Sequence, residues 1–422
     1  MITNQGSTDQ VEIEDEGPQS LRPWAAFTFR DYRYLWATGL ATVVSRWMRI
    51  LVTAQWLFEE TDSAALLGFI GGVQLVVQIP ALLWGGALAD YMNRKHLVAV
   101  AHTVTFAVLL ALGLLAAADL LTVWQVYVAI GITAATQVIS QPAAAALTPA
   151  VVPRRHLMLA ITGETATMNA GSILAPLLFA GVAEWFGLTA AFFVAAGTTA
   201  PAALLPLFIH ARGQVEQRAE GSTVRRVWEG FLFVIRHPIL PGLFLLDIGI
   251  TVVSFYREIL PVIAKGLFKG GAGAVGVLGS ANSAGAVAGS FGALFFAGYR
   301  SKGMLVIYAS LAYAVVLLVF SNVTVLWAGA ITIALLGLAD AVTVAVRQTT
   351  VQLTTPDHMR GRATAFLVLA AVTANNVGTL WVGLWSEWIG EAATMTLGAF
   401  LAFGATLLIW RMWRPLREYR YP

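Results

Sequence analysis

Cysteine is absent from the 422 residues, which excludes disulfide bonds, thiolate nucleophiles and cysteine-based metal sites. Charge is also scarce, since Asp, Glu, Lys and Arg make up 12% of the chain and hydrophobic residues make up 58%. A soluble domain carries about a quarter charged residues, and a water-soluble protein of this size could not cover its surface with so few. The chain therefore needs lipid as a second solvent, and we expect an integral membrane protein.

Motifs for catalysis and cofactor binding are missing as well. The sequence holds no phosphate-binding GxxxxGK[ST], no HExxH and no GxSxG segment. Its six histidines are scattered, and its net charge of +3 comes with basic residues that are spread over loops instead of gathered in a patch. We therefore expect no enzyme activity, no metal or other cofactor, and no nucleic-acid partner.

The chain contains many long apolar segments. A helix needs about 20 apolar residues to cross the hydrocarbon core of a bilayer. Twelve such stretches run over 34–58, 64–88, 97–118, 121–149, 157–183, 188–210, 239–264, 273–298, 303–321, 324–352, 363–386 and 391–413. The segment 1–20 is polar and acidic, lacks the pattern of a secretory signal peptide, and is expected to be disordered.

The loops between these stretches alternate in charge. Arginine and lysine recur before the first stretch, after the second, fourth, sixth, eighth and tenth, and at the C-terminal end. The other loops carry acidic residues, and their basic residues are Lys265 and Lys269. Because basic loops stay in the cytoplasm, we expect both termini and the 211–237 segment there, with the protein in a bacterial inner membrane.

The two halves of the chain repeat at an offset of 203 residues. The pairs that superpose are Gly86 and Gly289, Trp124 and Trp327, Pro153 and Pro356, Glu184 and Glu387, Trp185 and Trp388, and Gly187 and Gly390. Such a parallel repeat is typical of transporters whose site lies between the halves. We expect an all-α membrane protein with twelve transmembrane helices in two six-helix bundles, 21–210 and 238–413. A cytoplasmic linker, 211–237, would join them, and 1–20 and 414–422 would be cytoplasmic tails.

The sharpest local motif is GALADYMNRK, which follows the second stretch. It resembles the signature that the major facilitator superfamily carries between its helices 2 and 3. The matching residues are Gly86, Asp90, Arg94 and Lys95. Asn93 replaces the turn glycine, as a residue that tolerates the left-handed conformation. The resemblance implies a conformational latch that touches the other bundle in one access state; the alternative is an ordinary charged loop.

The resemblance covers the chain from Phe29 to about Arg411 and points to the enterobactin-exporter-like branch. Segments 149–160, 246–268 and 340–365 carry this narrower likeness. A motif that resembles the glycine- and proline-rich motif of proton antiporters is present in altered form as Gly171, Ala175, Pro176 and Gly181. Close helix packing is the alternative explanation. The arginine that such antiporters carry in helix 4 is absent.

Charged residues inside the predicted helices are costly in lipid and are candidates for function. The proton-coupling candidates are Asp340, Glu164, Asp247, Arg46 and Arg49. Asp340 leads because it lies near the middle of the tenth stretch, where Arg46 or Arg49 could approach it across the bundle interface. A fixed ion pair is the alternative. We expect Arg257 and Glu258 at the membrane interface, where long side chains reach water.

Uncharged polar and aromatic residues within the helices could line a substrate cavity. They are Gln55, Trp56, Gln74, Gln78, Gln137, Gln141, Asn169, Tyr256, Asn282, Asn375, Asn376 and Trp381. The alternative is that each is satisfied by contacts between helices.

These patterns favour a secondary active transporter that exports a small amphipathic compound, such as a siderophore or drug, by proton antiport. The expected partners are the lipid bilayer, the small-molecule substrate and protons, and we expect a monomer. Uptake or lysolipid transport on the same fold is one alternative. A receptor or scaffold that transports nothing is another, because a fold does not fix a function.

Overall fold

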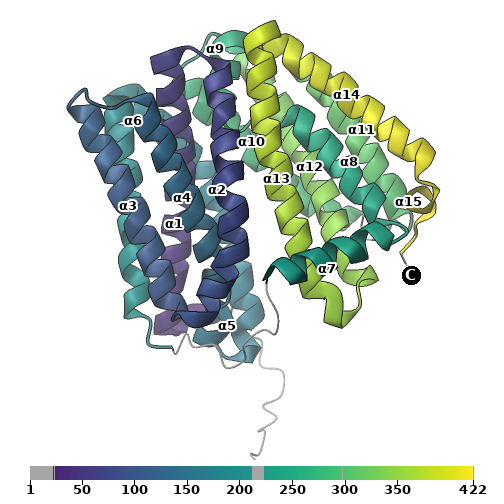
Figure 1. The fold of residues 1–422 in the computed structure, drawn as a ribbon, viewed down its shortest axis with the longest axis horizontal. Helices are drawn as coiled ribbons and strands as arrows, with labels where there is room; N and C mark the ends of the chain where they lie inside the picture. The colour runs from purple at the N-terminus through teal and green to yellow at the C-terminus, as the bar shows by residue number, and fades with distance from the viewer. Residues whose placement is uncertain (1–21, 23, 212–222, 297, 422) are drawn as a thin grey trace, which may run out of the picture.

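The computed structural model describes residue 22 and residues 24–211, 223–296 and 298–421, without the side chains of 84–91 and 223. Within these ranges every regular element is a helix. Two groups of long helices stand beside each other, the first drawn in purple to blue and the second in green to yellow (Figure 1). The predicted all-α fold is confirmed.

The first group follows the first predicted bundle. Its helices are α1 (Arg30–Thr61), α2 (Ala64–Tyr91), α3 (Arg94–Ala117), α4 (Val123–Ala145), α5 (Thr148–Val151) and α6 (Leu157–Leu204). The helices of the second group are α7 (Thr223–Arg236), α8 (Leu240–Ser254), α9 (Leu260–Phe268), α10 (Ala272–Phe295), α11 (Lys302–Phe320), α12 (Leu326–Thr354), α13 (Asp357–Ile389), α14 (Glu391–Met412) and α15 (Arg414–Glu418). Each predicted stretch overlaps at least one of these helices.

Two glycines show the repeat in the backbone. Gly187 interrupts α6 with φ 81° and ψ 172°, between the fifth and sixth predicted stretches. Gly390 separates α13 from α14 with φ 82° and ψ 159°. A side chain disfavours such a positive φ, so glycine permits both turns. These glycines superpose at the 203-residue offset, and their shared geometry supports the predicted repeat.

The predicted continuous helix over 239–264 is wrong. α8 ends at Ser254 and α9 begins at Leu260, and α9 is bent by 112° from α10. Pro261 lies in the first turn of α9, a position that suits proline because the first amides of a helix have no partner within it. Apolar residues continue on both sides of the break, so hydropathy alone does not show it.

The predicted count of twelve spans is not reproduced. Within the described ranges, eight helices are long and apolar enough to cross a membrane, or ten when each strongly bent pair counts as one span. One of the eight, Arg154–Phe208, contains the fifth and sixth predicted helices. α1 is not among them, because Arg46, Arg49 and its other polar residues lower its hydropathy. The chain is nonetheless a multi-pass membrane protein by length and composition.

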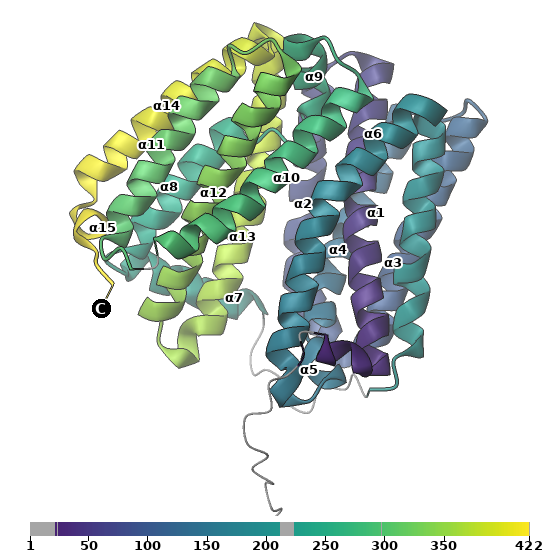
Figure 2. The same cartoon turned by 180° about the vertical axis from the view of Figure 1, so that it is seen from behind.

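Part of the predicted linker is helical. α7 runs along one end of the second group (Figure 1) and is bent by 104° from α8. It packs on α13, where Glu229 forms an ion pair of 2.9 Å with Arg362. Residues 212–222 of the linker lie outside the described ranges. We call the end of the molecule with α5, α7 and α15 the linker side and the opposite end the far side (Figures 1 and 2).

The apolar core shows where the two groups meet. One cluster of buried residues includes Leu57 of α1 together with Leu260 of α9. Two further clusters each stay within one group, around Val98 of α3 and around Phe244 of α8. The groups therefore share a core toward the far side and have separate cores toward the linker side, where they diverge (Figures 1 and 2).

Candidate transport site between the two bundles

Polar contacts join the two bundles on the far side. Lys265 Nζ lies 2.6 Å from Asp62 Oδ1, across from the end of α1. Glu387 at the end of α13 accepts hydrogen bonds from the Ser63 hydroxyl and the Ala65 amide, both at 3.0 Å. Since Ala65 lies in the first turn of α2, the carboxylate meets the positive end of that helix.

Small residues bring the same helices close together. A Cβ on Gly383 of α13 would collide with the backbone of Gly68 in α2, and one on Gly276 of α10 would collide with the Pro176 carbonyl of α6. Small side chains allow such an approach of helix backbones. Pro176 belongs to the altered glycine- and proline-rich motif, so its position agrees with the packing explanation of that motif.

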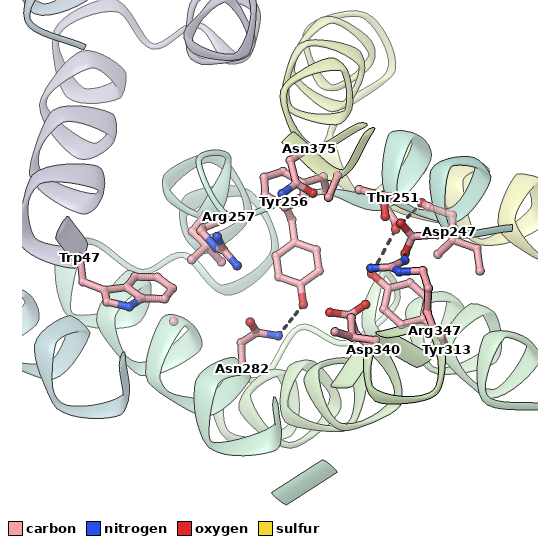
Figure 3. Close-up of a pocket in the computed structure, with 17 residues that line it drawn as sticks. Trp47, Asp247, Thr251, Tyr256, Arg257, Asn282, Tyr313, Asp340, Arg347 and Asn375 are labelled. Atoms are coloured by element: carbon pink, nitrogen blue, oxygen red, sulfur yellow. Dashed lines mark hydrogen bonds and ion pairs between the residues drawn. The ribbon is translucent and has the colours of Figure 1, made fainter. Parts of the chain in front are cut away.

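An open cavity of about 920 Å³ lies between the bundles. Trp47 of α1 lines one side, and the rest comes from α8, the α8–α9 connection, α9, α10, α11, α12 and α13 (Figure 3). The second bundle contributes three charged residues from its helices and one from the α8–α9 connection. The cavity therefore offers both charged and apolar surface, as a site for an amphipathic ligand requires.

Asp247 and Arg347 form an ion pair in this cavity (Figure 3). Their side chains are 18% and 9% exposed. Arg347 Nε has no hydrogen-bond partner among the described residues. A largely buried charge needs its partner, so Asp247, a predicted proton-coupling residue, is held in a fixed pair.

Asp340 is different because its carboxylate makes no ion pair or hydrogen bond with the described residues. The residue is exposed to the cavity, and its carboxylate points into it (Figure 3). Arg257 and Arg347 line the same cavity, and the positive charge of Arg257 acts on this carboxylate. Beside it, Asn282 donates a hydrogen bond of 2.7 Å to the Tyr256 hydroxyl. A carboxylate in this setting can gain or lose a proton without breaking an ion pair.

The predicted interfacial position of Arg257 and Glu258 is wrong. The Arg257 guanidinium lies 5.3 Å from the ring centroid of Trp47, in the other bundle, and 5.4 Å from that of Phe255. Glu258 is 6% exposed and accepts a hydrogen bond of 3.2 Å from Thr379. Both residues lie in the break between α8 and α9, which turns them toward the bundle interface.

A second open cavity, of about 1370 Å³, lies within the first bundle between α1, α3, α4 and α6. Arg46 and Arg49 line it. Arg49 donates hydrogen bonds to Thr133 at 3.1 Å and to Gln137 Oε1 at 2.7 Å. The predicted approach of Arg49 to Asp340 is therefore wrong, because α4 of its own bundle holds it. The charges that act on Arg46 are Arg257 and Glu258, and Asp340 is not among them.

Glu164 lies in the second cavity, away from Asp340. It accepts hydrogen bonds of 2.9 and 3.2 Å from the Thr148 hydroxyl, at the linker side of the first bundle. In the same cavity, His102 Nε2 lies 3.2 Å from the Thr42 hydroxyl. The structure thus separates the proton-coupling candidates into two cavities, and the role of each stays a prediction.

The predicted cavity residues divide into two sets. Tyr256, Asn282 and Asn375 line the cavity between the bundles, and Gln137 and Gln141 line the one within the first bundle. Gln55, Trp56, Gln74, Gln78, Asn169, Asn376 and Trp381 line neither of these cavities. Some of the residues that line neither cavity bind other side chains. Asn376 of α13 donates a hydrogen bond of 2.9 Å to Gln78 of α2, and Gln55 donates one of 2.7 Å to Glu59 within α1.

The predicted latch is only partly described. Gly86 and Asp90 lie in the last turns of α2, and their side chains are outside the described residues. Asn93 has φ −62° and ψ 122° and accepts a hydrogen bond of 3.2 Å from the Lys95 amide, so it caps α3 in an extended conformation and does not use the left-handed one that asparagine tolerates. Arg94 and Lys95 donate to backbone carbonyls of the first bundle at 3.4 and 2.7 Å. Both therefore bind their own bundle in this conformation.

Comparison with known proteins identifies the family to which this chain belongs. The family model described as Major Facilitator Superfamily matches residues 35–371. The chain belongs to the major facilitator superfamily. It is 27% identical over 348 residues to the enterobactin exporter EntS of Salmonella choleraesuis, covering 80% of this chain and 81% of that one. It is also 27% identical over 350 residues to the enterobactin exporter EntS of Escherichia coli O81, with 80% of each chain covered.

Solved structures share the superfamily fold. The nucleoside transporter NupG superposes with a TM-score of 0.73 at 13% identity, over 91% of this chain and 100% of that one. A bacterial homologue of the human lysosomal transporter Spinster, inward-facing and unoccupied, gives 0.64 at 14%, over 92% and 98%. At these identities the likeness shows the fold alone. Family and fold together make the chain a multi-pass transporter of a small molecule.

The sequence analysis did not identify two residues that line the cavity between the bundles. Trp47 lies next to Arg46, and an aromatic residue beside a membrane arginine could have been recognised as a cation–π candidate. Tyr313 of α11 lines the same cavity, and its hydroxyl lies 3.1 Å from that of Ser254. It stands in an uncharged apolar stretch, so no signal in the sequence distinguishes it.

Proposed function

We propose that this transporter exports a small amphipathic compound, such as a siderophore, in exchange for protons by alternating access. Asp340 carries the proposal, because its carboxylate has no ion pair with the described residues and is exposed to the cavity between the bundles. Its neighbour Asp247 is paired with Arg347 and is less suited to gain and lose a proton. The relatives named enterobactin exporters support export and a cargo of siderophore size.

We further propose that the linker side faces the cytoplasm of a bacterial inner membrane. The basic loops that the sequence places together support this orientation. The shared core and the Asp62–Lys265 contact then close the periplasmic side. The conformation is inward-facing on this assignment, with Asp340 accessible from the cytoplasm. Substrate would bind as Asp340 releases its proton there, and reprotonation from the periplasm would accompany release outside.

The test is Asp340→Asn in proteoliposomes with an imposed pH gradient and enterobactin as the candidate substrate. We expect gradient-driven accumulation to fall to the level of protein-free liposomes, because an amide cannot carry the proton. Exchange down a substrate gradient should persist, since the cavity keeps its shape.

Asp357→Asn is the matched control, because this acid is 88% exposed at the start of α13 and far from the cavity. It should accumulate substrate like the wild type. An Asp340→Asn variant that still drives uphill accumulation would contradict the proposal, and Glu164 would become the next residue to test.

A further inference from the structure

The cavity within the first bundle carries more positive than negative charge. Among the described residues, its charged lining consists of two arginines, Arg46 and Arg49, and one acid, Glu164, with His102 as a further titratable group. The described lining of the cavity between the bundles is balanced by contrast, with two acids and two arginines. Because guanidinium groups stay charged in proteins, the cavity within the first bundle is the one that favours an anion.

The two arginines lie on one face of α1 and line the same cavity. They are three residues apart, a spacing that makes side chains neighbours on a helix. Hydrogen bonds to Thr133 and Gln137 of α4 hold the Arg49 guanidinium in place, and Arg49 is 6% exposed. Arg46 makes no ion pair or hydrogen bond with the described residues. Both cations therefore lack an acidic partner within the part of the chain that the structure describes, and Arg46 keeps its donors for a ligand.

The acid of this cavity does not neutralise the arginines. Glu164 forms no ion pair with the described residues, and its carboxylate accepts hydrogen bonds from the Thr148 hydroxyl at the linker side. A largely buried cation without an acid is unfavourable unless an anion compensates it. Guanidinium groups bind carboxylate, phosphate and sulfonate oxygens through charge-assisted hydrogen bonds. The two arginines therefore define a site for an anionic group.

The shape of the cavity indicates what kind of molecule carries this group. Its lining follows α1 from Leu35 to Arg49, which is about 21 Å at a rise of 1.5 Å per residue. Apolar side chains along it include Trp36 of α1, Val98 of α3 and Met168 of α6. The cavity is therefore elongated, with its arginines toward one end of α1 and apolar surface along its length, as an amphipathic ligand requires.

We propose that the cavity within the first bundle is a second ligand site, in which Arg46 and Arg49 bind the anionic group of an elongated amphiphile whose apolar part lies along α1 toward Trp36. The inference goes beyond the proposed function, because the site is separate from the cavity with Asp340 and its ligand need not be the transported substrate. All of the described residues that line it belong to the first bundle. A rigid movement of one bundle against the other would therefore leave the site intact.

The test places a fluorine label in each cavity, since Trp36 lines the one within the first bundle and Trp47 lines the one between the bundles. The purified full chain carries 5-fluorotryptophan in phosphatidylcholine nanodiscs, and Trp36→Phe and Trp47→Phe assign the two fluorine resonances. The probes are 8-anilinonaphthalene-1-sulfonate and its uncharged counterpart N-phenyl-1-naphthylamine, with free concentrations corrected on empty nanodiscs. We expect the sulfonate to shift the Trp36 resonance at lower concentrations than the Trp47 resonance.

Arg46→Gln should weaken the sulfonate binding that Trp36 reports by about tenfold or more, the scale of a lost charge-assisted hydrogen bond. Binding of the uncharged probe should change by less than about twofold. Because Arg46 makes no hydrogen bond with the described residues, its replacement leaves the hydrogen bonds between helices intact. Arg46→Lys keeps the charge and should recover most of the sulfonate binding. Arg411→Gln, at an exposed position of α14, is the matched control and should bind like the wild type.

The opposite results would overturn the proposal. Unchanged sulfonate binding in Arg46→Gln would do so, as would an equal loss for both probes, which would indicate altered packing. A sulfonate that shifts the Trp47 resonance first, and that loses affinity in Arg257→Gln instead, would place the anion between the bundles and overturn the proposal too.

Phosphatidylglycerol in the nanodisc distinguishes two sources of the ligand. Displacement of the sulfonate by this lipid would assign the site to a lipid headgroup, and no displacement would assign it to a soluble amphiphile; both results keep the anion site. Binding is measured at equilibrium without a pH gradient, so a failure of proton coupling in the transport test would leave it unaffected.

Discussion

At the scale of single residues, the charges of the site differ in whether they have a partner. Asp247→Asn removes the only acid that pairs with Arg347 among the described residues and leaves a largely buried cation. Losing one member of a buried pair costs about 3–5 kcal/mol, and water in the adjacent cavity places the loss at the lower end. We expect a lower Tm of the purified protein, measured by circular dichroism during heating.

The double variant Asp247→Asn/Arg347→Gln is the control for this prediction. It removes both charges and should recover most of the stability, since the penalty comes from the uncompensated cation. A double variant less stable than Asp247→Asn would show that shape, and not charge, determines the effect.

The identity of the charged residues could be predicted from the sequence, and their partners could not. Asp340 stands out as an acid in an apolar stretch, and the structure exposes it to the cavity. Arg347 meets Asp247 because α8 and α12 are neighbours, a relation that no local pattern encodes. Arg257 was expected at the membrane surface since the helix break that turns it inward has no hydropathy signal.

At the scale of helices, apolar length predicted most elements, and interruptions of helices were predicted less well. Gly187 falls between two predicted stretches, so its turn agrees with the sequence pattern. The break from Phe255 to Ile259 lies inside one predicted stretch. The polar 211–237 segment was expected to be a linker, yet α7 forms there because its apolar face can pack on α13.

Helix packing on the far side gives a second prediction. Gly383→Ala would place a Cβ against the backbone of Gly68 and should disfavour closure of that side. Because the chain has no cysteine, spin labels at Glu60→Cys and Lys269→Cys would report the distance between the bundles. We expect a larger population of long distances. Gly404→Ala, whose Cβ meets nothing within 4 Å, should match the wild type; identical distances in all three proteins would refute the prediction.

The contact of α7 with α13 should depend on pH. A hydrogen bond from Arg225, aided by the charge of Arg362, lowers the pKa of Glu229. A lowered carboxyl pKa stabilises the contact above the unfolded-state value, about 4.3, and this contribution is lost as pH falls through the folded-state value. We expect faster hydrogen exchange of α7 amides in acid, after correction for intrinsic rates. Glu229→Gln should show that faster exchange already at neutral pH, and slow exchange in this variant would argue against the ion pair.

At the scale of the whole molecule, the repeat explains where the bundles touch. Asp62 and Lys265 are 203 residues apart and form an ion pair. Equivalent positions of a twofold repeat can touch only where the axis passes between them, so the pseudo-twofold axis runs through this far-side contact. Glu184 and Glu387 are a second equivalent pair. Glu387 meets the start of α2, and Glu184 lies beside Gly273 in the first turn of α10.

The two far-side contacts should differ in how strongly they hold the bundles closed. Asp62 and Lys265 are 71% and 61% exposed, and such surface pairs contribute about 0–1 kcal/mol. Glu387 accepts two hydrogen bonds at a helix start, where loss of a capping group costs about 1 kcal/mol. With spin labels at the same two positions, Lys265→Ala should therefore shift the equilibrium between closed and open far sides by less than about fivefold, because 1 kcal/mol is the upper end for such pairs. Glu387→Ala should shift it by about fivefold, since 1.4 kcal/mol corresponds to about tenfold. If Lys265→Ala opens the far side as much as Glu387→Ala, the ion pair on the axis, and not the helix cap, holds the bundles together.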